Sequence, residues 1–230
     1  MSAFPSQRLL LLDTSGPAGT VALVVDGKLV SKRHSSQARD HAAVVNAAIA
    51  EVLEEGHLRM ADLTGICVMA GPGSYTGLRI GLATAKGLCY ALEVPLYLQN
   101  NLEVLAAGAR AVLPSHEACF VILPARSSEY FLAAYNSAGE VLLAPRHAMK
   151  DEAIALLAGL PDTTIICGDS SAANEVCSTR RFPFVAETDA LGAWISVAVV
   201  QVLNGESTPI AEATPFYLKS AFITTPRVKV

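Results

Sequence analysis

The sequence predicts an α/β protein made of two similar halves, each a mixed sheet with flanking helices. Three strand-like runs open the chain, three more follow residue 117, and strands and helices alternate after each set. A polar stretch with a proline near residue 114 separates the two sets. We therefore expect one unit over residues 1–112 and a second over residues 113–230. A helix at 188–204 is expected to pack back onto the first unit.

The composition is that of a globular chain with a high apolar content. Of 230 residues, 52% are hydrophobic and 17% are charged, against about 45–50% and about 25% in an average domain. This composition excludes intrinsic disorder. Because little polar surface remains to cover the apolar residues, we expect part of the apolar surface to belong to a partner.

The charge and the cysteine content indicate which partners and which cellular compartment to expect. The net charge is −4 and the basic residues are scattered, which disfavours independent binding of a nucleic acid. The five cysteines include no C-x-x-C pair and most lie in apolar runs, so we expect buried free thiols in a reducing compartment. No signal peptide and no apolar run of about 20 residues is evident, so the chain is expected to be soluble and cytoplasmic, without a membrane partner.

The first unit opens with three antiparallel strands, predicted at residues 8–12, 20–25 and 28–34. Asp26-Gly27 between the last two is a strong hairpin signal. The first strand ends in a polar run, which predicts a loop at the edge of the sheet.

The first predicted helix, residues 40–53, is apolar nearly all round. From residue 42 onward only Asn46 and Glu51 are polar, whereas a surface helix normally has one apolar stripe and one polar face. One face carries large apolar residues at helical spacing and another carries small ones, respectively Val45, Ile49 and Val52, and Ala43, Ala47 and Ala50.

A buried strand is predicted at 64–70, followed by a glycine-rich loop and a helix at about 74–91. Small residues recur every four positions on this helix: Gly77, Gly81, Ala85 and Cys89. Each internal glycine costs about 1 kcal/mol relative to alanine. We therefore expect close helix–helix packing along this small-residue face to offset that cost.

The remaining elements complete the duplicated layout. A strand at 95–98 and a helix at 101–111 end the first unit. In the second unit, strands are predicted at 118–123, 129–135, 141–147 and 164–167, and helices at 151–158, just after 171 and at 189–203, with an extended tail from 205. This order is that of a duplicated ribonuclease-H-like fold.

Three strand-to-loop junctions are candidate phosphate-binding loops, because small residues there offer backbone N–H groups to an anion. They contain, respectively, Asp13, Thr14 and Ser15; Gly71, Gly73 and Ser74; and Gly168 and Asp169. The second loop fits neither the G-x-x-x-x-G-K-[ST] nor the G-x-G-x-x-G spacing. The first and third junctions are more typical of structural turns, and the second fits a tight turn with Ser74 capping a helix as well as it fits an anion site.

No catalytic or metal-binding constellation is evident. The five histidines include no pair at a spacing of four, and there is no G-x-S-x-G nucleophile elbow. No carboxylate pair stands out as an acid–base couple. The sequence predicts a nucleotide-binding scaffold with no catalytic residue and no metal site.

Two segments resemble the TsaB (YeaZ) family. They are residues 9–15 (LLLLDTS) with 20–23, and residues 71–81 (GPGSYTGLRIG), a string highly specific to this group. Gly168-Asp169 and residues 215–219 (PFYLK) resemble the family's second-half strand end and its C-terminal segment. The resemblance is strong over 8–98 and looser from there to 219.

The resemblance implies the actin, Hsp70 and sugar-kinase fold in a short, degenerate form. It also implies a non-catalytic role in making N6-threonylcarbamoyladenosine (t6A) beside the anticodon of tRNAs that read codons starting with A. The expected partner is TsaD, the paralogue that transfers the threonylcarbamoyl group, joined by the ATPase TsaE. tRNA would be reached through this complex. No tightly bound cofactor is expected, and ATP or ADP would bind only at the complex interface.

The resemblance combines with the two unusual helices into a hypothesis about docking. We expect TsaD to bind on Ala42, Val45, Ile49 and Val52 of the first helix and on Gly77, Gly81 and Ala85 of the second. A large charged residue at Gly81 or Ala85 is then expected to abolish pairing without unfolding the chain. Where the family usually has Asp-Ala-Arg, this chain has Pro124-Ala125-Arg126, which puts any site built on that carboxylate in doubt.

The sequence leaves three alternatives to the accessory role. A kinase-like ATP phosphotransferase needs an acid–base carboxylate and an adenosine-binding motif, for which Gly168-Asp169-Ser170 is a weak substitute. A peptidase lacks a metal pair and a nucleophile elbow. A stand-alone homodimeric scaffold would use the same two helices and is compatible with the accessory role.

Overall fold

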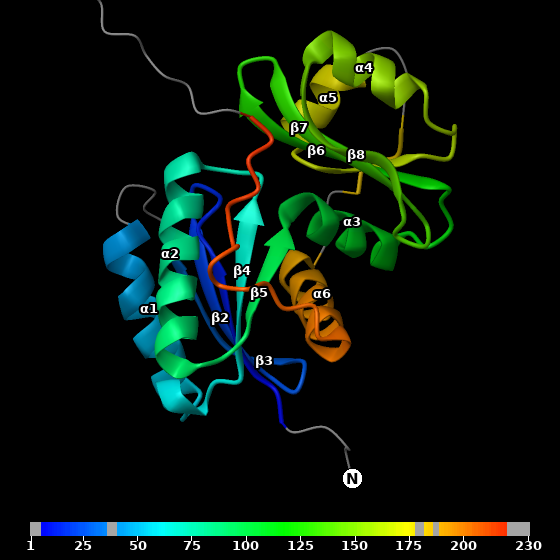
Figure 1. The fold of residues 1–230 in the computed structure, drawn as a ribbon. Helices are drawn as coiled ribbons and strands as arrows, with labels where there is room; N and C mark the ends of the chain where they lie inside the picture. The colour runs from blue at the N-terminus through cyan, green and yellow to red at the C-terminus, as the bar shows by residue number, and fades with distance from the viewer. Residues whose placement is uncertain (1–5, 36–40, 178–181, 186–188, 220–230) are drawn as a thin grey trace, which may run out of the picture.

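The computed structural model of the chain describes residues 6–35, 41–177, 182–185 and 189–219 (Figure 1). The first lobe contains β1 (Arg8–Asp13), β2 (Gly19–Val25), β3 (Lys28–Ser35), α1 (His41–Glu55), the short 3-10 helix η1 (Met60–Asp62), β4 (Gly65–Gly71), α2 (Tyr75–Leu92), β5 (Leu96–Asn100) and α3 (Asn101–Val112). The second lobe contains β6 (Ala118–Arg126), β7 (Glu129–Asn136), β8 (Val141–Met149), α4 (Lys150–Ala158), β9 (Ile165–Gly168) and α5 (Ser170–Val176). The last helix, α6 (Ala190–Asn204), packs on the sheet of the first lobe.

Each lobe is built on one mixed sheet. The strand order is β3-β2-β1-β4-β5 in the first and β8-β7-β6-β9 in the second. β1 pairs antiparallel with β2 and parallel with β4, and β6 repeats this arrangement with β7 and β9. The predicted α/β class with two mixed sheets is therefore confirmed, and the carboxyl ends of each parallel pair meet at one edge of their sheet.

The continuous apolar run in β1 follows from burial on both faces of the first sheet. Leu10 and Leu12 pack in one cluster with α1 and α2. Leu9 and Leu11 point to the other face and pack with Trp194 and other residues of α6. Alternate side chains of a strand lie on opposite faces, so a strand with helices on both sides needs apolar residues at every position.

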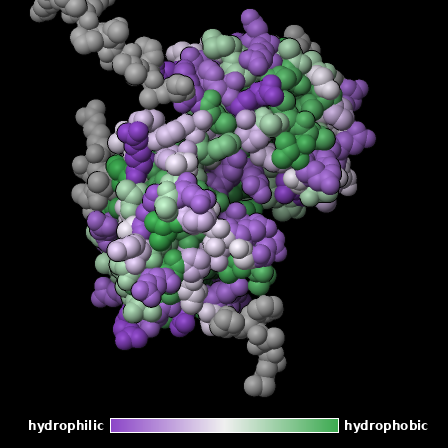
Figure 2. Space-filling model, in the orientation of Figure 1, coloured by the Kyte–Doolittle hydropathy of each residue, from purple (hydrophilic) through white to green (hydrophobic). Residues whose placement is uncertain are grey.

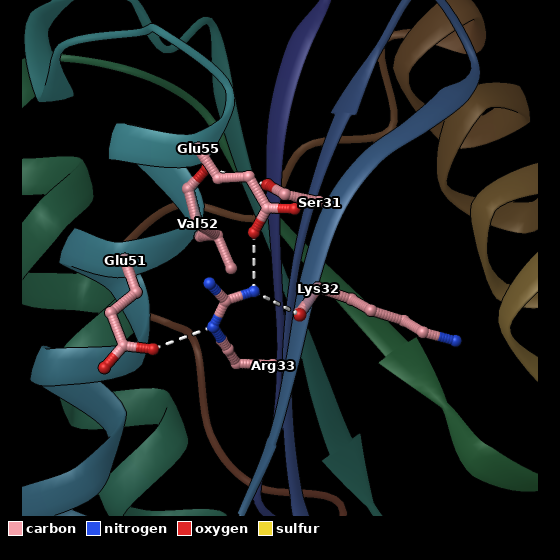
Figure 3. A network of polar contacts seen from close by, with 6 residues as sticks. All are labelled: Ser31, Lys32, Arg33, Glu51, Val52 and Glu55. Atoms are coloured by element: carbon pink, nitrogen blue, oxygen red, sulfur yellow. Dashed lines mark hydrogen bonds and ion pairs between the residues drawn. The ribbon is translucent and has the colours of Figure 1, made fainter.

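Figure 3 shows how β3 holds α1. Arg33 Nε donates to Glu51 Oε2 (2.7 Å) and Arg33 Nη1 donates to Glu55 Oε2 (2.6 Å). Ser31 Oγ donates to the Val52 carbonyl (2.7 Å). Glu51, one of the few polar residues of this helix, therefore joins Glu55 and Val52 in the polar contacts between α1 and β3.

Element boundaries differ from the predicted ones by a few residues at most, as expected where helix ends fray. η1 had no sequence prediction. The predicted capping residue of α1, Asp40, lies outside the described residues. From 205 to 219 the chain has no helix or strand, as expected for an extended tail. None of the helices in the described ranges is long and apolar enough to cross a membrane.

Candidate functional site

A cleft of about 1150 Å³ lies between the two lobes. All three predicted junctions reach it, at Asp13 and Ser15, at Gly73 and Ser74, and at Gly168 and Asp169, whereas Thr14 and Gly71 do not line it. Apolar residues from both lobes and α6 contribute the rest of the wall, including Met69, Val104, Leu123, Phe131 and Trp194. Charged groups on its lining include Asp13, Asp169, Arg126 and Lys219, and the His34 side chain also lies there.

The loop after β1 is held by its own side chains. The Asp13 carboxylate accepts hydrogen bonds from the Ser15 backbone N–H (2.8 Å) and from Ser15 Oγ (2.6 Å). Thr14 is 2% exposed and its hydroxyl donates to the Gly77 carbonyl (2.7 Å). The Asp13 carboxylate thus stabilises a local turn of the kind that aspartate side chains commonly form.

The loop after β4 packs directly on the loop after β1. The Ser74 backbone N–H donates to the Ser15 carbonyl (2.7 Å). A Cβ atom at Gly73 would lie 2.5 Å from the same carbonyl oxygen. Gly73 is therefore needed for the close approach of the two loops, and the Ser74 hydroxyl accepts from the Gly77 N–H (3.3 Å) as the predicted helix cap.

Asn101, at the start of α3, joins both loops and was not singled out by sequence reasoning. Its Nδ2 donates to Ser15 Oγ (2.8 Å) and to the Pro72 carbonyl (2.8 Å). The only sequence signal for this role is the Asn100-Asn101 pair at a strand-to-helix junction. Asn101 therefore completes a closed hydrogen-bond network at the base of the cleft.

The loop after β9 is also a structural turn. Gly168 has φ of +108°, and a Cβ atom there would lie 2.2 Å from the Ile122 carbonyl oxygen. The Asp169 N–H donates to that oxygen (2.9 Å) and its carboxylate caps α5 through the Ala172 N–H (2.8 Å). Glycine is required here by backbone geometry.

These contacts test whether the cleft loops fit a nucleotide phosphate. Phosphate loops leave several backbone N–H groups directed at the anion. Here the N–H groups of Ser15, Ser74 and Asp169 all donate within the protein. These three N–H groups are therefore engaged within the protein, and phosphate binding at the junctions stays a prediction.

The structure contradicts part of the docking hypothesis. Val45, Ile49 and Val52 are 5%, 2% and 0% exposed and belong to the chain's own core with Ala85. They face the first sheet, so they offer no free surface. The structure does not describe the side chain of Ala42.

The small-residue face of α2 is likewise internal. Cβ atoms would lie 1.9 Å from the Thr14 carbonyl oxygen at Gly77 and 2.3 Å from Thr14 Oγ1 at Gly81. The helix lies so close to the end of β1 that only glycine fits at these two positions. The sequence predicted close helix–helix packing along this face, whereas the close neighbour at Gly77 and Gly81 is the chain's own β1 loop.

The outward faces of the same two helices carry a different set of small residues. Ala47 and Ala50 of α1 and Ala83 and Gly87 of α2 are exposed, and Tyr90 is 81% exposed. A Cβ atom at Gly87 would meet nothing within 4 Å. Because Gly87 has no internal packing role, its helix-propensity cost of about 1 kcal/mol is not offset within this chain.

The exposed apolar residues do not gather on α1 and α2 as the composition suggested. In Figure 2 hydrophobic residues form separate patches on both lobes, among hydrophilic ones. The large exposed hydrophobic residues are spread over several elements and include Leu29, Val30, Val141, Leu142, Val200 and Leu203. Most of the apolar content fills the four core clusters.

We expect only one of the five thiols to react in the native chain. Cys67, Cys89, Cys119 and Cys167 are buried and Cys177 is partly exposed. Burial raises the pKa of the Cys89 thiol to about 12, which leaves almost no thiolate at pH 8. Mass spectrometry after iodoacetamide treatment should find modification at Cys177 alone, and at all five thiols after denaturation. Native modification of Cys67 would contradict the packing described.

No cluster of potential metal ligands is present among the described residues.

Comparison with known proteins gives matches over most of the chain. Residues 28–202 match the family model for TsaD, tRNA N6-adenosine threonylcarbamoyltransferase. Over 102 residues the chain is 33% identical to the tRNA threonylcarbamoyladenosine biosynthesis protein TsaB of Bacillus subtilis and 32% identical to that of Escherichia coli. Each match covers 44% of this chain and 44% of the relative, so the chain spans less than half the length of these relatives in the match.

Solved structures agree over a longer stretch. YeaZ from Pseudomonas aeruginosa superposes with a TM-score of 0.75 at 26% identity, covering 92% of this chain and 100% of that chain. The ethanolamine utilization protein EutJ from Carboxydothermus hydrogenoformans has a TM-score of 0.52 at 11% identity, over 86% of this chain and 91% of that one. The second likeness shows the shared fold alone.

Proposed function

Because this chain belongs to the TsaB (YeaZ) family, within the TsaD-like branch of the actin-like ATPase superfamily, we propose that it is an accessory subunit of t6A synthesis. In this proposal it binds a TsaD-type transferase and activates transfer of the threonylcarbamoyl group to tRNA. The tRNAs are those that read codons starting with A. The chain itself contributes no catalytic residue.

The observation that carries the accessory role is the closed network at the base of the cleft. Asn101, Ser15 and Ser74 use their polar groups to join the two loops of the first lobe. A phosphotransferase instead needs preorganised donors directed at the transferred group. The network therefore favours a scaffold over the kinase-like alternative.

The outward faces of α1 and α2 are the surface we propose for the transferase. Their small side chains, with the exposed Gly87, allow another helix to approach closely. The exposed Tyr90 at the end of this surface suits the aromatic anchor that protein interfaces commonly use. The same surface serves a homodimer when the transferase is absent.

The remaining expected partners belong to the same proposal. The ATPase TsaE joins the pair, and tRNA is reached through the complex in the cytoplasm. ATP or ADP binds at the complex interface, with the partner supplying part of the site.

Deletion of the gene tests the function directly. Bulk tRNA from the deletion strain is expected to lack t6A in a nucleoside digest. The t6A is expected to return when the intact chain is supplied. In a purified system, transfer should require both this chain and the transferase. Normal t6A after deletion would contradict the proposal, and ATP turnover by the isolated chain would favour the kinase-like alternative.

A further inference from the structure

The segment after α6 runs along the first lobe before it reaches the second. The Thr208 N–H donates to the Leu96 carbonyl (2.8 Å), and Lys86 Nζ donates to the Ala213 carbonyl (3.1 Å). Residues 216–219 then line the cleft. We name residues 215–219 the strap. In Figure 1 it is the orange-to-red segment that passes the end of β4 and continues toward β7.

The backbone of the strap is attached to the end of β4. The Phe216 N–H donates to the Ala70 carbonyl (2.7 Å). Gly71 has φ of +129°, and a Cβ atom there would lie 2.7 Å from the Phe216 carbonyl oxygen. Gly71, singled out from the sequence as a phosphate-loop residue, therefore makes room for the strap.

A second attachment joins the strap to the first turn of α2. The Tyr217 ring stacks on Tyr75 with centroids 4.8 Å apart. Arg79 Nε donates to Tyr217 Oη (3.1 Å), and the guanidinium lies 4.2 Å from the centroid of the Tyr75 ring. These three residues hold the strap to the first lobe through stacking and cation–π contact.

Two residues further on, the strap reaches the second lobe. Lys219 Nζ forms an ion pair with Glu129 Oε2, which also lies 3.1 Å from His147 Nε2. Leu218 packs against the core cluster that contains Val121 and Ala133. The Lys219 contact, followed by that of His147, lowers the pKa of the Glu129 carboxyl.

Apart from the strap, α3 is in contact with both lobes. It packs on α6 and β5 of the first and on β6 and β9 of the second. The strap therefore adds a further contact between the two lobes, beside the cleft. Its ion pair is partly exposed, with 29% exposure at Lys219 and 20% at Glu129. A partly exposed pair contributes little free energy, so this link can open without unfolding either lobe.

We propose that the strap is a latch that sets the opening of the cleft, held to the first lobe by Tyr217 and to the second by Lys219. When the Lys219–Glu129 pair and the Leu218 contact are both broken, the second lobe is released, moves about α3 and opens the cleft. This inference is independent of the proposed function, because it concerns the relative motion of the two lobes in the isolated chain.

Distance measurement between the lobes tests the latch. Spin labels at Glu54→Cys in α1 and Glu152→Cys in α4, both exposed, are read by pulsed electron paramagnetic resonance. The background carries Cys177→Ala, since the other thiols are buried. Lys219→Gln with Tyr217→Ala is expected to shift the distances to larger values and broaden their distribution. Lys28→Gln, which removes an exposed charge of the first lobe, should leave the distance distribution unchanged.

Three comparisons keep the test decisive. Circular dichroism establishes that each variant is folded. Lys219→Gln alone should shift the distances in the same direction as the double variant, by a smaller amount. Exchange of the charges, Lys219→Glu with Glu129→Lys, should recover much of the parent distribution. An unchanged distribution in folded Lys219→Gln and in the folded double variant would overturn the proposal, as would an equal shift in Lys28→Gln.

Discussion

Replacing Gly81 with glutamate is expected to unfold the first lobe. A Cβ atom at this position lies 2.3 Å from Thr14 Oγ1, and the added carboxylate would be placed between α2 and the buried end of β1. An unpaired buried charge together with overpacking costs about 3–5 kcal/mol or more. That is a large part of the roughly 5–15 kcal/mol that stabilises a typical domain. The packing around Gly81 therefore argues against the sequence-based expectation that such a variant stays folded.

Gly87→Glu on the same helix is the matched control. Its Cβ atom meets nothing within 4 Å, and the glycine-to-glutamate change improves helix propensity by up to about 1 kcal/mol. Chemical denaturation followed by circular dichroism should show a strongly reduced midpoint for Gly81→Glu and an unchanged or raised one for Gly87→Glu. Equal midpoints for the two variants would contradict the packing of α2 on the β1 loop.

Arginine on the outward face of α2 is expected to weaken binding of the TsaD-type partner strongly while the chain stays folded. Ala83 and Gly87 are both exposed and lie one turn apart. Two long charged side chains there prevent another helix from approaching closely. Loss of a central interface contact typically costs at least about 2 kcal/mol, so the dissociation constant should rise by roughly 30-fold or more.

Calorimetry with the purified partner measures this effect on Ala83→Arg with Gly87→Arg. Ala155→Arg, at an exposed position of α4 in the second lobe, is the control and should bind as the parent does. The outward-face variant should fail to restore t6A in the deletion strain. Unchanged affinity in a folded outward-face variant would remove α2 from the interface and leave the accessory role to other surfaces.

The fold could be predicted because the local signals in the sequence are all compatible with a single arrangement of strands and helices. The apolar run of β1, the Asp26-Gly27 turn and the cap at Ser74 each specify an element by period, turn chemistry or hydrogen bonding. The strap could not be predicted in the same way. Its contacts join Arg79 to Tyr217 and Glu129 to Lys219, residues far apart in the chain.

The sequence by itself determined the family, the α/β class and the two helices whose composition is unusual. Only the tertiary structure decided which side of each helix faces the sheet. Small residues at a spacing of four favour any close neighbour, whether it belongs to the same chain or to a partner. At Gly81 that neighbour is Thr14 of the chain's own β1 loop, whereas at Gly87 no neighbour is present. The two glycines have the same local signal, and burial alone distinguishes the core position from the exposed one.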